Sequence, residues 1–215
     1  MAQIFPRWSN KAPMALGLGL PLLTSFVVFA LWYWASPKYT DVGYAPRQPV
    51  SYSHKLHAAD LGMDCRYCHN TVEQSFYAAV PPSSTCMNCH NVVLKESPKL
   101  APVRSSVASG MPVPWIKVHQ LPDYAYFYHN VHVAAGLGCA ECHGRVDHMK
   151  IVHLHAPLSM SWCLQCHRAP YPRLRPVSEV TNMSWDRNEA GYDPNTDPAR
   201  KRKLNPPVHC SGCHR

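Results

Sequence analysis

The stretch YSHKLHAADLGMDCRYCH at residues 52–69 returns in altered form as FYHNVHVAAGLGCAECH at residues 127–143. Each copy has two histidines three residues apart, a spacer of six or seven residues, and Cys-x-x-Cys-His at its end. A further Cys-x-x-Cys-His follows each copy, after a Pro-x-Ser element at residues 82–84 or 157–159. Internal repeats of this kind are typical of stacked structural units, so the sequence predicts two related modules.

All ten cysteines lie in five copies of Cys-x-x-Cys-His, whereas about 0.03 copies would be expected by chance in such a composition. We number these copies motif 1 to motif 5 in chain order: Cys65, Cys68 and His69; Cys86, Cys89 and His90; Cys139, Cys142 and His143; Cys163, Cys166 and His167; Cys210, Cys213 and His214. Two thiols at this spacing can bond to the vinyl groups of one haem, and the histidine that follows can bind its iron. The motifs therefore predict five covalently attached haems c, each with its iron.

Two other kinds of cysteine site fit this pattern poorly. A disulfide framework would not require a histidine after every second cysteine. A structural zinc site needs four ligands, which five Cys-x-x-Cys pairs cannot supply evenly.

Each iron can take a sixth ligand, and nine histidines lie outside the motifs. The two His-x-x-His pairs supply four candidates, because residues three apart on a helical turn point the same way and can reach two different irons. A fifth candidate lies in WIKVHQLP at residues 115–122. The predicted sixth ligands are His54, His57, His119, His129 and His132, with Met149 and Met160 as alternatives in the second module. The remaining histidines are expected to be spare: His148, His153, His155 and His209.

The N-terminal segment predicts a membrane anchor. No charged residue lies between Lys11 and Lys38, and residues 15–35 are almost wholly apolar. About 20 apolar residues cross a bilayer as a helix, and Arg7 and Lys11 before the stretch predict a cytoplasmic N-terminus with the haem domain on the periplasmic side of the cell membrane. A cleaved signal peptide is the alternative, although the stretch is longer than usual for one and ends in bulky aromatic residues.

The predicted organisation is a cytoplasmic stub and transmembrane anchor at residues 1–36, a linker at 37–50 and a pentahaem domain at 51–215. Within that domain we expect dihaem modules at 51–118 and 119–176, then a loop and the fifth haem at 177–215. With 21 prolines and ten glycines, the chain is expected to be mainly α-helical with much irregular structure and almost no β-sheet. The formal charge of +8 would favour nucleic acid, but the propionates of five haems would offset it, so no nucleic-acid partner is expected.

The repeat resembles the small multihaem cytochromes of the c7 and c3 type, in which a histidine of the pair serves the haem that follows. Longer strings narrow this resemblance: SHKLH (53–57), MDCRYCHNTVE (63–73), TCMNCH (85–90), VHQLP (118–122) and PLSMSWCLQCHR (157–168). Together with five motifs and an N-terminal anchor, they are similar to the pentahaem cytochrome c subunit of alternative complex III. The resemblance covers nearly the whole chain.

That resemblance implies an electron-transfer subunit of a membrane-bound quinol-oxidising complex in the respiratory chain. In such complexes polytopic membrane subunits oxidise quinol, and electrons pass through an iron–sulfur subunit. The pentahaem subunit and a monohaem cytochrome then deliver them to a periplasmic acceptor or a terminal oxidase. The resemblance implies no independent catalysis and no catalytic residue for this chain.

Two other functions remain open from the residues. A membrane-anchored multihaem quinol dehydrogenase that feeds a periplasmic reductase would need a quinol pocket beside its first haem. A multihaem reductase of nitrite or a similar small molecule would need an open coordination position on one iron. The supply of histidines disfavours the reductase, because it provides enough ligands for all five irons.

Overall fold

The structure, a computed structural model, describes residues 4–193, 196 and 204–215. The chain divides into two compact units, Met1–Asp41 and Val42–Arg215, which are described separately below. This division falls inside the linker expected at residues 37–50. The predicted domain and module boundaries stay predictions.

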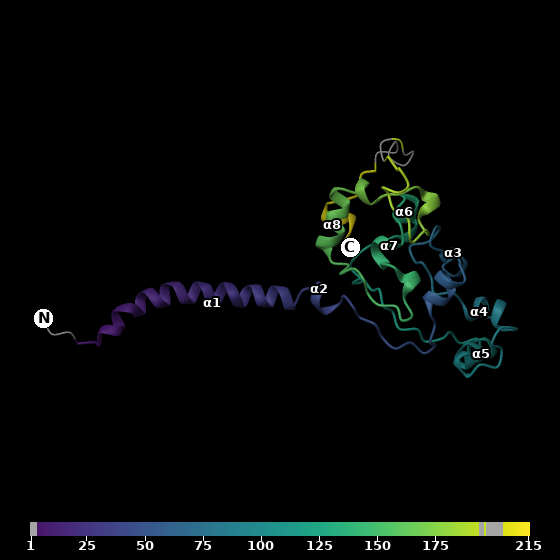
Figure 1. Cartoon of the computed structure of the whole chain (residues 1–215), viewed down its shortest axis with the longest axis horizontal. Helices are drawn as coiled ribbons and strands as arrows, with labels where there is room; N and C mark the ends of the chain where they lie inside the picture. Colours follow the sequence, from purple (N-terminus) through teal and green to yellow (C-terminus); the bar gives the residue numbers. More distant parts are fainter. Residues whose placement is uncertain (1–3, 194–195, 197–203) are drawn as a thin grey trace. The chain divides into compact units, whose positions relative to one another are not determined.

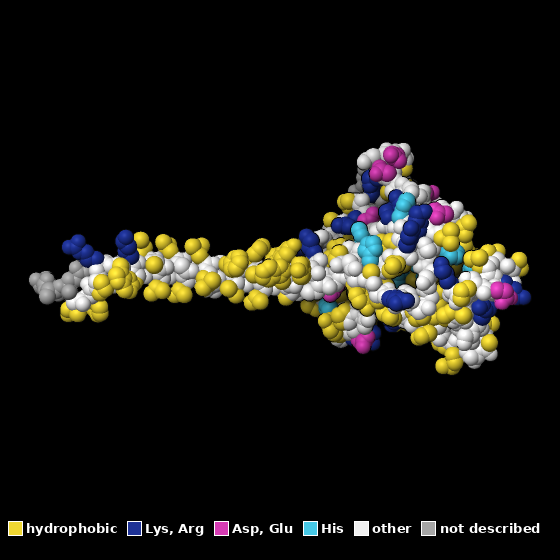
Figure 2. Space-filling view, turned by 60° about the horizontal axis from the view of Figure 1, so that its bottom comes forward, with side chains coloured by type: hydrophobic (Ala, Val, Ile, Leu, Met, Phe, Trp, Pro, Cys, Tyr) yellow, Lys and Arg dark blue, Asp and Glu magenta, His cyan; other side chains and the backbone are white. Residues whose placement is uncertain are grey.

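One apolar helix dominates the first unit. Helix α1 spans Ala12–Trp34, between the short turn η1 at Arg7–Lys11 and the short helix α2 at Pro37–Thr40. At 1.5 Å per residue it extends about 34 Å, and Figure 2 shows apolar side chains along its length. None of its residues is buried. Its length and composition therefore suit a membrane span, a property that it shares with signal sequences.

The second unit consists of short helices joined by irregular chain (Figure 1). The α-helices are α3 Cys65–Cys68, α4 Ser83–His90, α5 Ala101–Ser109, α6 His129–Ala134, α7 Ala140–His143 and α8 Met160–Arg168. One element, η2 Lys55–Asp60, is a π-helix. The 3-10 helices are η3 Pro98–Leu100, η4 Val146–His148, η5 Tyr171–Arg173, η6 Val177–Glu179 and η7 Cys210–Gly212. Strands are absent from the described residues, where isolated bridges pair Ala125 with His214 and Leu137 with Leu174. The predicted mainly α fold with almost no sheet is confirmed.

Every motif lies on a helical turn or at its end. Motifs 1 to 4 are carried by α3, α4, α7 and α8, motif 5 by η7, and the two His-x-x-His pairs by η2 and α6. Asp64 caps α3 by accepting a hydrogen bond from the backbone N–H of Arg66 at 2.8 Å. Ser159 caps α8 in the same way, from Trp162 at 3.4 Å. Such caps satisfy N–H groups that have no partner within the helix, so the local sequence itself fixes where these two motif helices begin.

The apolar core of the second unit is small. Among the described residues, the buried apolar side chains are Val50, Val103, Val113, Val133, Met149, Leu154, Ala156, Leu174 and Val180. Val50, Val103 and Val113 form a cluster against which Met87 and Trp115 pack. A domain of this length normally buries a larger apolar core. Much of the folding free energy must therefore come from apolar surface other than this cluster.

A buried arginine fixes the chain after α8 to motif 3. Arg175 is 4% exposed. Its guanidinium donates to the carbonyl oxygen of Asn182 at 2.9 Å, pairs with Glu141 at 3.3 Å and lies 4.9 Å from the ring centre of Trp185. Glu141 lies between the two cysteines of motif 3, so this one side chain holds the segment that follows η5 against that motif.

We predict that Arg175→Ala lowers the free energy of unfolding by about 2–3 kcal/mol, because the Glu141 carboxylate and a backbone carbonyl would lose their buried partner. Thermal denaturation of the full chain, monitored by circular dichroism, measures this change. Lys150→Ala, at an exposed position, is the matched control and should leave the melting temperature unchanged. Equal melting temperatures for the two variants would show that Arg175 has no such role.

Candidate functional site

Four pairs of imidazoles face each other across the second unit. Each pair joins a motif histidine to a histidine from η2 or α6. The ring centres lie 6.5 Å apart for His54 and His69, 6.4 Å for His57 and His90, 6.4 Å for His129 and His143, and 6.1 Å for His132 and His167. In two pairs the rings are nearly parallel, at 1° for His54 with His69 and 10° for His129 with His143.

These separations are too long for ring stacking and match the distance between two imidazoles that bind one metal ion from opposite sides. A metal–imidazole bond is about 2.0–2.1 Å, and the nitrogen lies roughly 1.1 Å from its ring centre, so two axial imidazoles place their centres roughly 6.3 Å apart. The four measured values, 6.1 to 6.5 Å, fall on either side of that figure. The backbone thus brings each pair to the spacing that axial ligands of one iron require.

Backbone carbonyls orient most of these rings. In six of the eight, Nδ1 lies 2.6 to 2.9 Å from a carbonyl oxygen: His57 from Ser53, His69 from Ala79, His90 from Val93, His129 from Phe76, His132 from Tyr128 and His167 from Pro207. A carbonyl oxygen can only accept, so Nδ1 carries the proton and Nε2 keeps its lone pair. This is the tautomer that binds a metal through Nε2.

Burial favours the neutral form of four of the paired imidazoles. Together with nearby histidines it lowers the pKa of His54 to about 4 and that of His143 to about 3, and burial is the larger cause in both. Burial also lowers the pKa of His129 and His132. An uncharged imidazole has a free lone pair at neutral pH. These side chains are therefore ready to act as ligands.

The cysteines carry thiols suited to covalent attachment. All ten are free of disulfides. Burial raises the pKa of Cys68 and Cys86, and it raises that of Cys142 to about 12, so these groups stay protonated at neutral pH. Over residues 4–193, 196 and 204–215, no group of three or more His, Cys, Asp or Glu side chains is arranged to hold a metal ion by itself. This arrangement fits thiols that add to vinyl groups better than disulfide or zinc chemistry.

An aromatic residue covers each His-x-x-His pair, a feature that the sequence analysis missed. Tyr52 stacks on His57 with ring centres 4.5 Å apart and meets His54 edge-on at 4.8 Å. In the second copy Phe127 stacks on His132 at 4.6 Å and meets His129 edge-on at 4.8 Å. Both aromatic residues stand two positions before the first histidine of their pair. An alignment of the two repeats would therefore have revealed this shared aromatic position.

Motif 5 differs from the other four. Its histidine, His214, faces the ring of Tyr124 at 5.8 Å, and among the described ring contacts none sets a second imidazole opposite it. The predicted fifth ligand, His119, lies beside motif 3, with its Nε2 3.2 Å from Nδ1 of His143. The role of His119 as a sixth ligand stays a prediction.

The alternative ligands and the histidines expected to be spare lie in varied places. Met149 is buried in the core, whereas Met160 is 63% exposed at the first residue of α8. His148 is exposed and lies 3.4 Å from the carboxylate of Asp147. His209 contacts the hydroxyl of Ser211 at 3.2 Å, beside motif 5.

Comparison with known proteins agrees with this geometry. Residues 50–105 match the family described as cytochrome c7 and related cytochrome c. Over 137 residues the chain is 34% identical to the menaquinone reductase, multiheme cytochrome c subunit, of Nitratidesulfovibrio vulgaris (strain Hildenborough). That match covers 62% of this chain and 63% of the relative, so the chain spans less than two thirds of that protein's length. The chain is thus homologous to a multihaem cytochrome c subunit, and the resemblance to cytochrome c7 is confirmed for residues 50–105.

The residues present therefore fit haem c. At motifs 1 to 4 two thiols and an imidazole stand on one helical turn, and a second imidazole stands opposite at the spacing of a shared iron. The small apolar core fits as well, because porphyrin faces would supply the apolar surface that the chain itself offers only sparsely.

We predict that His54→Ala changes one iron from low spin to high spin and leaves all haems attached, because His54 supplies a ligand but no thioether bond. Electron paramagnetic resonance of the oxidised protein detects the high-spin iron, and denaturing mass spectrometry counts the haems. His148→Ala is the control and should leave every iron low-spin, since this exposed side chain pairs with Asp147. A His54→Ala protein with only low-spin iron would remove His54 from the ligand set.

Proposed function

We propose that this chain carries five haems c and serves as an electron-transfer subunit of a membrane-bound quinol:acceptor oxidoreductase. The spacing of the four imidazole pairs carries the proposal. Bound haem supplies an iron that gains and loses single electrons. Since two imidazoles would hold each iron at motifs 1 to 4, no iron there would be open to a substrate. At these four motifs the arrangement supports a relay and speaks against a nitrite-type reductase.

The link to quinone comes from the relative. Its name places a multihaem cytochrome subunit in a menaquinone reductase. We propose by homology that the present chain also works beside a quinone-reactive membrane protein. The chain supplies the carriers, and its partner subunits supply the quinol site.

The partners that we propose follow the resemblance to alternative complex III. They are polytopic quinol-oxidising membrane subunits, an iron–sulfur subunit and a monohaem cytochrome, with a periplasmic acceptor or a terminal oxidase beyond them. Helix α1 would anchor the chain in the cell membrane with its N-terminus in the cytoplasm. The haem domain would then lie on the periplasmic side, where c-type haems are attached.

A second candidate is a membrane-anchored multihaem quinol dehydrogenase that feeds a periplasmic reductase. The same name favours it, because a cytochrome subunit of a quinone-linked enzyme could itself meet the quinone. The two functions differ in one requirement. A dehydrogenase must react with quinol in the absence of other subunits.

We predict that the denatured full chain has the mass of the polypeptide plus five haems, because each of the five motifs supplies two thiols. Denaturing mass spectrometry measures it directly. A variant with Cys210→Ala and Cys213→Ala should retain four haems. Bare polypeptide in the unaltered protein would refute covalent attachment and, with it, the proposed function.

We further predict that quinol reduces the haems only when partner subunits are present. Menaquinol analogue is added to the complex, purified through a tag on this chain, and to the chain alone, and haem reduction is followed by stopped-flow absorbance. As a control, dithionite is added to both samples to show that the haems in each can be reduced. Equal rates in the two samples would establish the dehydrogenase function instead.

A further inference from the structure

We infer that the five motifs form a single unbranched row in the order 2–1–3–4–5, with motif 2 and motif 5 at its ends. The inference rests on the proposed function, because the row is a path for electrons only if each motif holds a haem. It also assigns the two ends as the places where partner redox groups must approach.

Motifs 1 and 2 are neighbours through η2 and through a direct contact. Within η2 and its N-cap, His54 faces His69 of motif 1, and three residues later His57 faces His90 of motif 2. The amide of Asn88, inside motif 2, also donates to the hydroxyl of Tyr67, inside motif 1, at 3.1 Å. One turn and one hydrogen bond thus set these two motifs side by side.

Motifs 1 and 3 meet at residues 75–79, which we call the bridging segment. Its Ala79 carbonyl accepts from Nδ1 of His69 in motif 1 at 2.6 Å. Its Phe76 carbonyl accepts from Nδ1 of His129, which faces motif 3, at 2.8 Å. Ala79 has φ +54°, a strained conformation for a residue with a Cβ.

Two cysteines also indicate that motifs 1 and 3 are neighbours. The thiols of Cys65 in motif 1 and Cys139 in motif 3 interact with each other, which raises the pKa of Cys65 and lowers that of Cys139. Because each thiol marks the edge of one attachment site, two edges meet here. The first motif of each repeat therefore lies at the middle of the row.

Motifs 3 and 4 are neighbours through α6, in the way that η2 joins motifs 1 and 2. His129 faces His143 of motif 3, and His132, three residues later on the same helix, faces His167 of motif 4. Two ligands one helical turn apart can serve only sites that lie next to each other. The two repeats therefore build two equivalent pairs of neighbours.

Motifs 4 and 5 meet through the segment before η7. The carbonyl of Pro207, three residues before Cys210, accepts from Nδ1 of His167 in motif 4 at 2.8 Å. The carbonyl of Cys213 in motif 5 accepts from the backbone N–H of Tyr126 at 2.7 Å. In the part of the chain that the structure describes, no hydrogen bond, ion pair or ring contact joins motif 2 to motif 3, 4 or 5.

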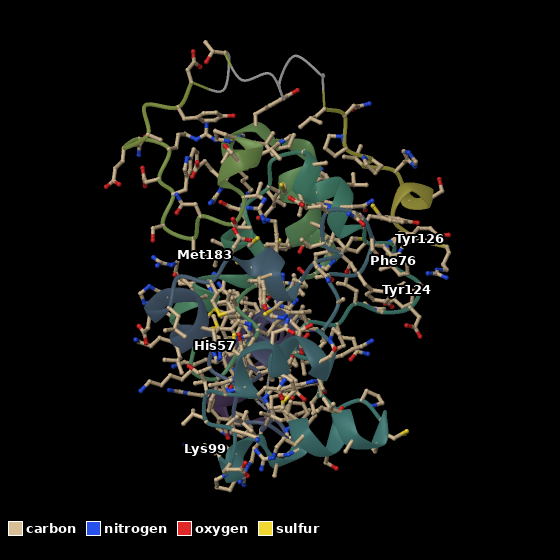
Figure 3. The ribbon with its side chains drawn as sticks, turned by 90° about the vertical axis from the view of Figure 1, so that its right-hand side faces the viewer. His57, Phe76, Lys99, Tyr124, Tyr126 and Met183 are labelled. Carbon is tan, nitrogen blue, oxygen red and sulfur yellow. The ribbon has the colours of Figure 1, made fainter. Side chains whose placement is uncertain are left out.

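The arrangement of the helices agrees with this order. Figure 1 shows α4, α3, α7 and α8 following one another across the second unit, with the C-terminus beside α8. These helices carry motifs 2, 1, 3 and 4. Figure 3 shows Tyr124 and Tyr126, which lie beside motif 5, apart from His57, which faces motif 2.

Exposure supports the assignment of the ends. Of the ten cysteines, Cys89 and Cys210 are exposed, and the other eight are half-buried. Cys89 lies in motif 2, and Cys210 lies in motif 5. The attachment sites at the two ends of the row are thus the most accessible to a partner protein.

Iron positions in the haem-loaded full chain test the inference. Iron anomalous scattering, or a cryo-electron microscopy map of the complex, gives all ten iron–iron distances that five irons define. The expected nearest neighbours are 2 with 1, 1 with 3, 3 with 4, and 4 with 5. An iron of motif 2 nearest to that of motif 3, or an iron of motif 5 nearest to any but motif 4, would overturn the order. Fewer than five irons would instead refute the proposed function.

A matched pair of variants tests the same order in solution. His129→Ala alters an inner site, and His57→Ala alters an end site. Because neighbouring irons influence each other's potential, a spectroelectrochemical titration should show shifted potentials at two other haems for His129→Ala and at one for His57→Ala. Both variants must keep five haems for the comparison. If His57→Ala shifted the potentials of as many other haems as His129→Ala, the proposed order would be contradicted.

Discussion

Two histidines one helical turn apart, on η2 with its N-cap and again on α6, each face a different motif histidine at the spacing of two imidazoles that would share one iron. That arrangement accounts for much of the second unit. It sets short helices at the motifs, puts carbonyl acceptors behind the rings, and explains the aromatic ring of Tyr52 or Phe127 over each pair. It also fits the small number of buried apolar side chains, because porphyrin faces would supply apolar surface for the chain to cover.

The same geometry connects structure with function. Carbonyls of Ala79, Phe76 and Val93 hold three of the rings in the tautomer with the proton on Nδ1, so the Nε2 atoms that would bind iron are already oriented. At motifs 1 to 4 two imidazoles would hold each iron and leave no position for a small substrate. A row of such sites with accessible ends suits a subunit that receives electrons from one partner and passes them to another.

The sequence predicts the local parts of this structure well and the long-range parts poorly. Cys-x-x-Cys-His and His-x-x-His are chemical patterns confined to a few residues, and the apolar stretch that becomes α1 is equally local, so each could be predicted directly. The order of the motifs depends on contacts such as that of His129 with Phe76, 53 residues apart. No periodicity encodes such a contact, and the position of His119 beside His143 depends on the fold in the same way.

The near-infrared magnetic circular dichroism of the oxidised, haem-loaded full chain tests the central claim most directly, because its charge-transfer bands distinguish histidine–histidine from histidine–methionine ligation of low-spin iron. We expect bands of histidine–histidine ligation with an intensity of at least four irons, one for each imidazole pair. Histidine–methionine bands or high-spin iron at more than one of the five sites would contradict the account.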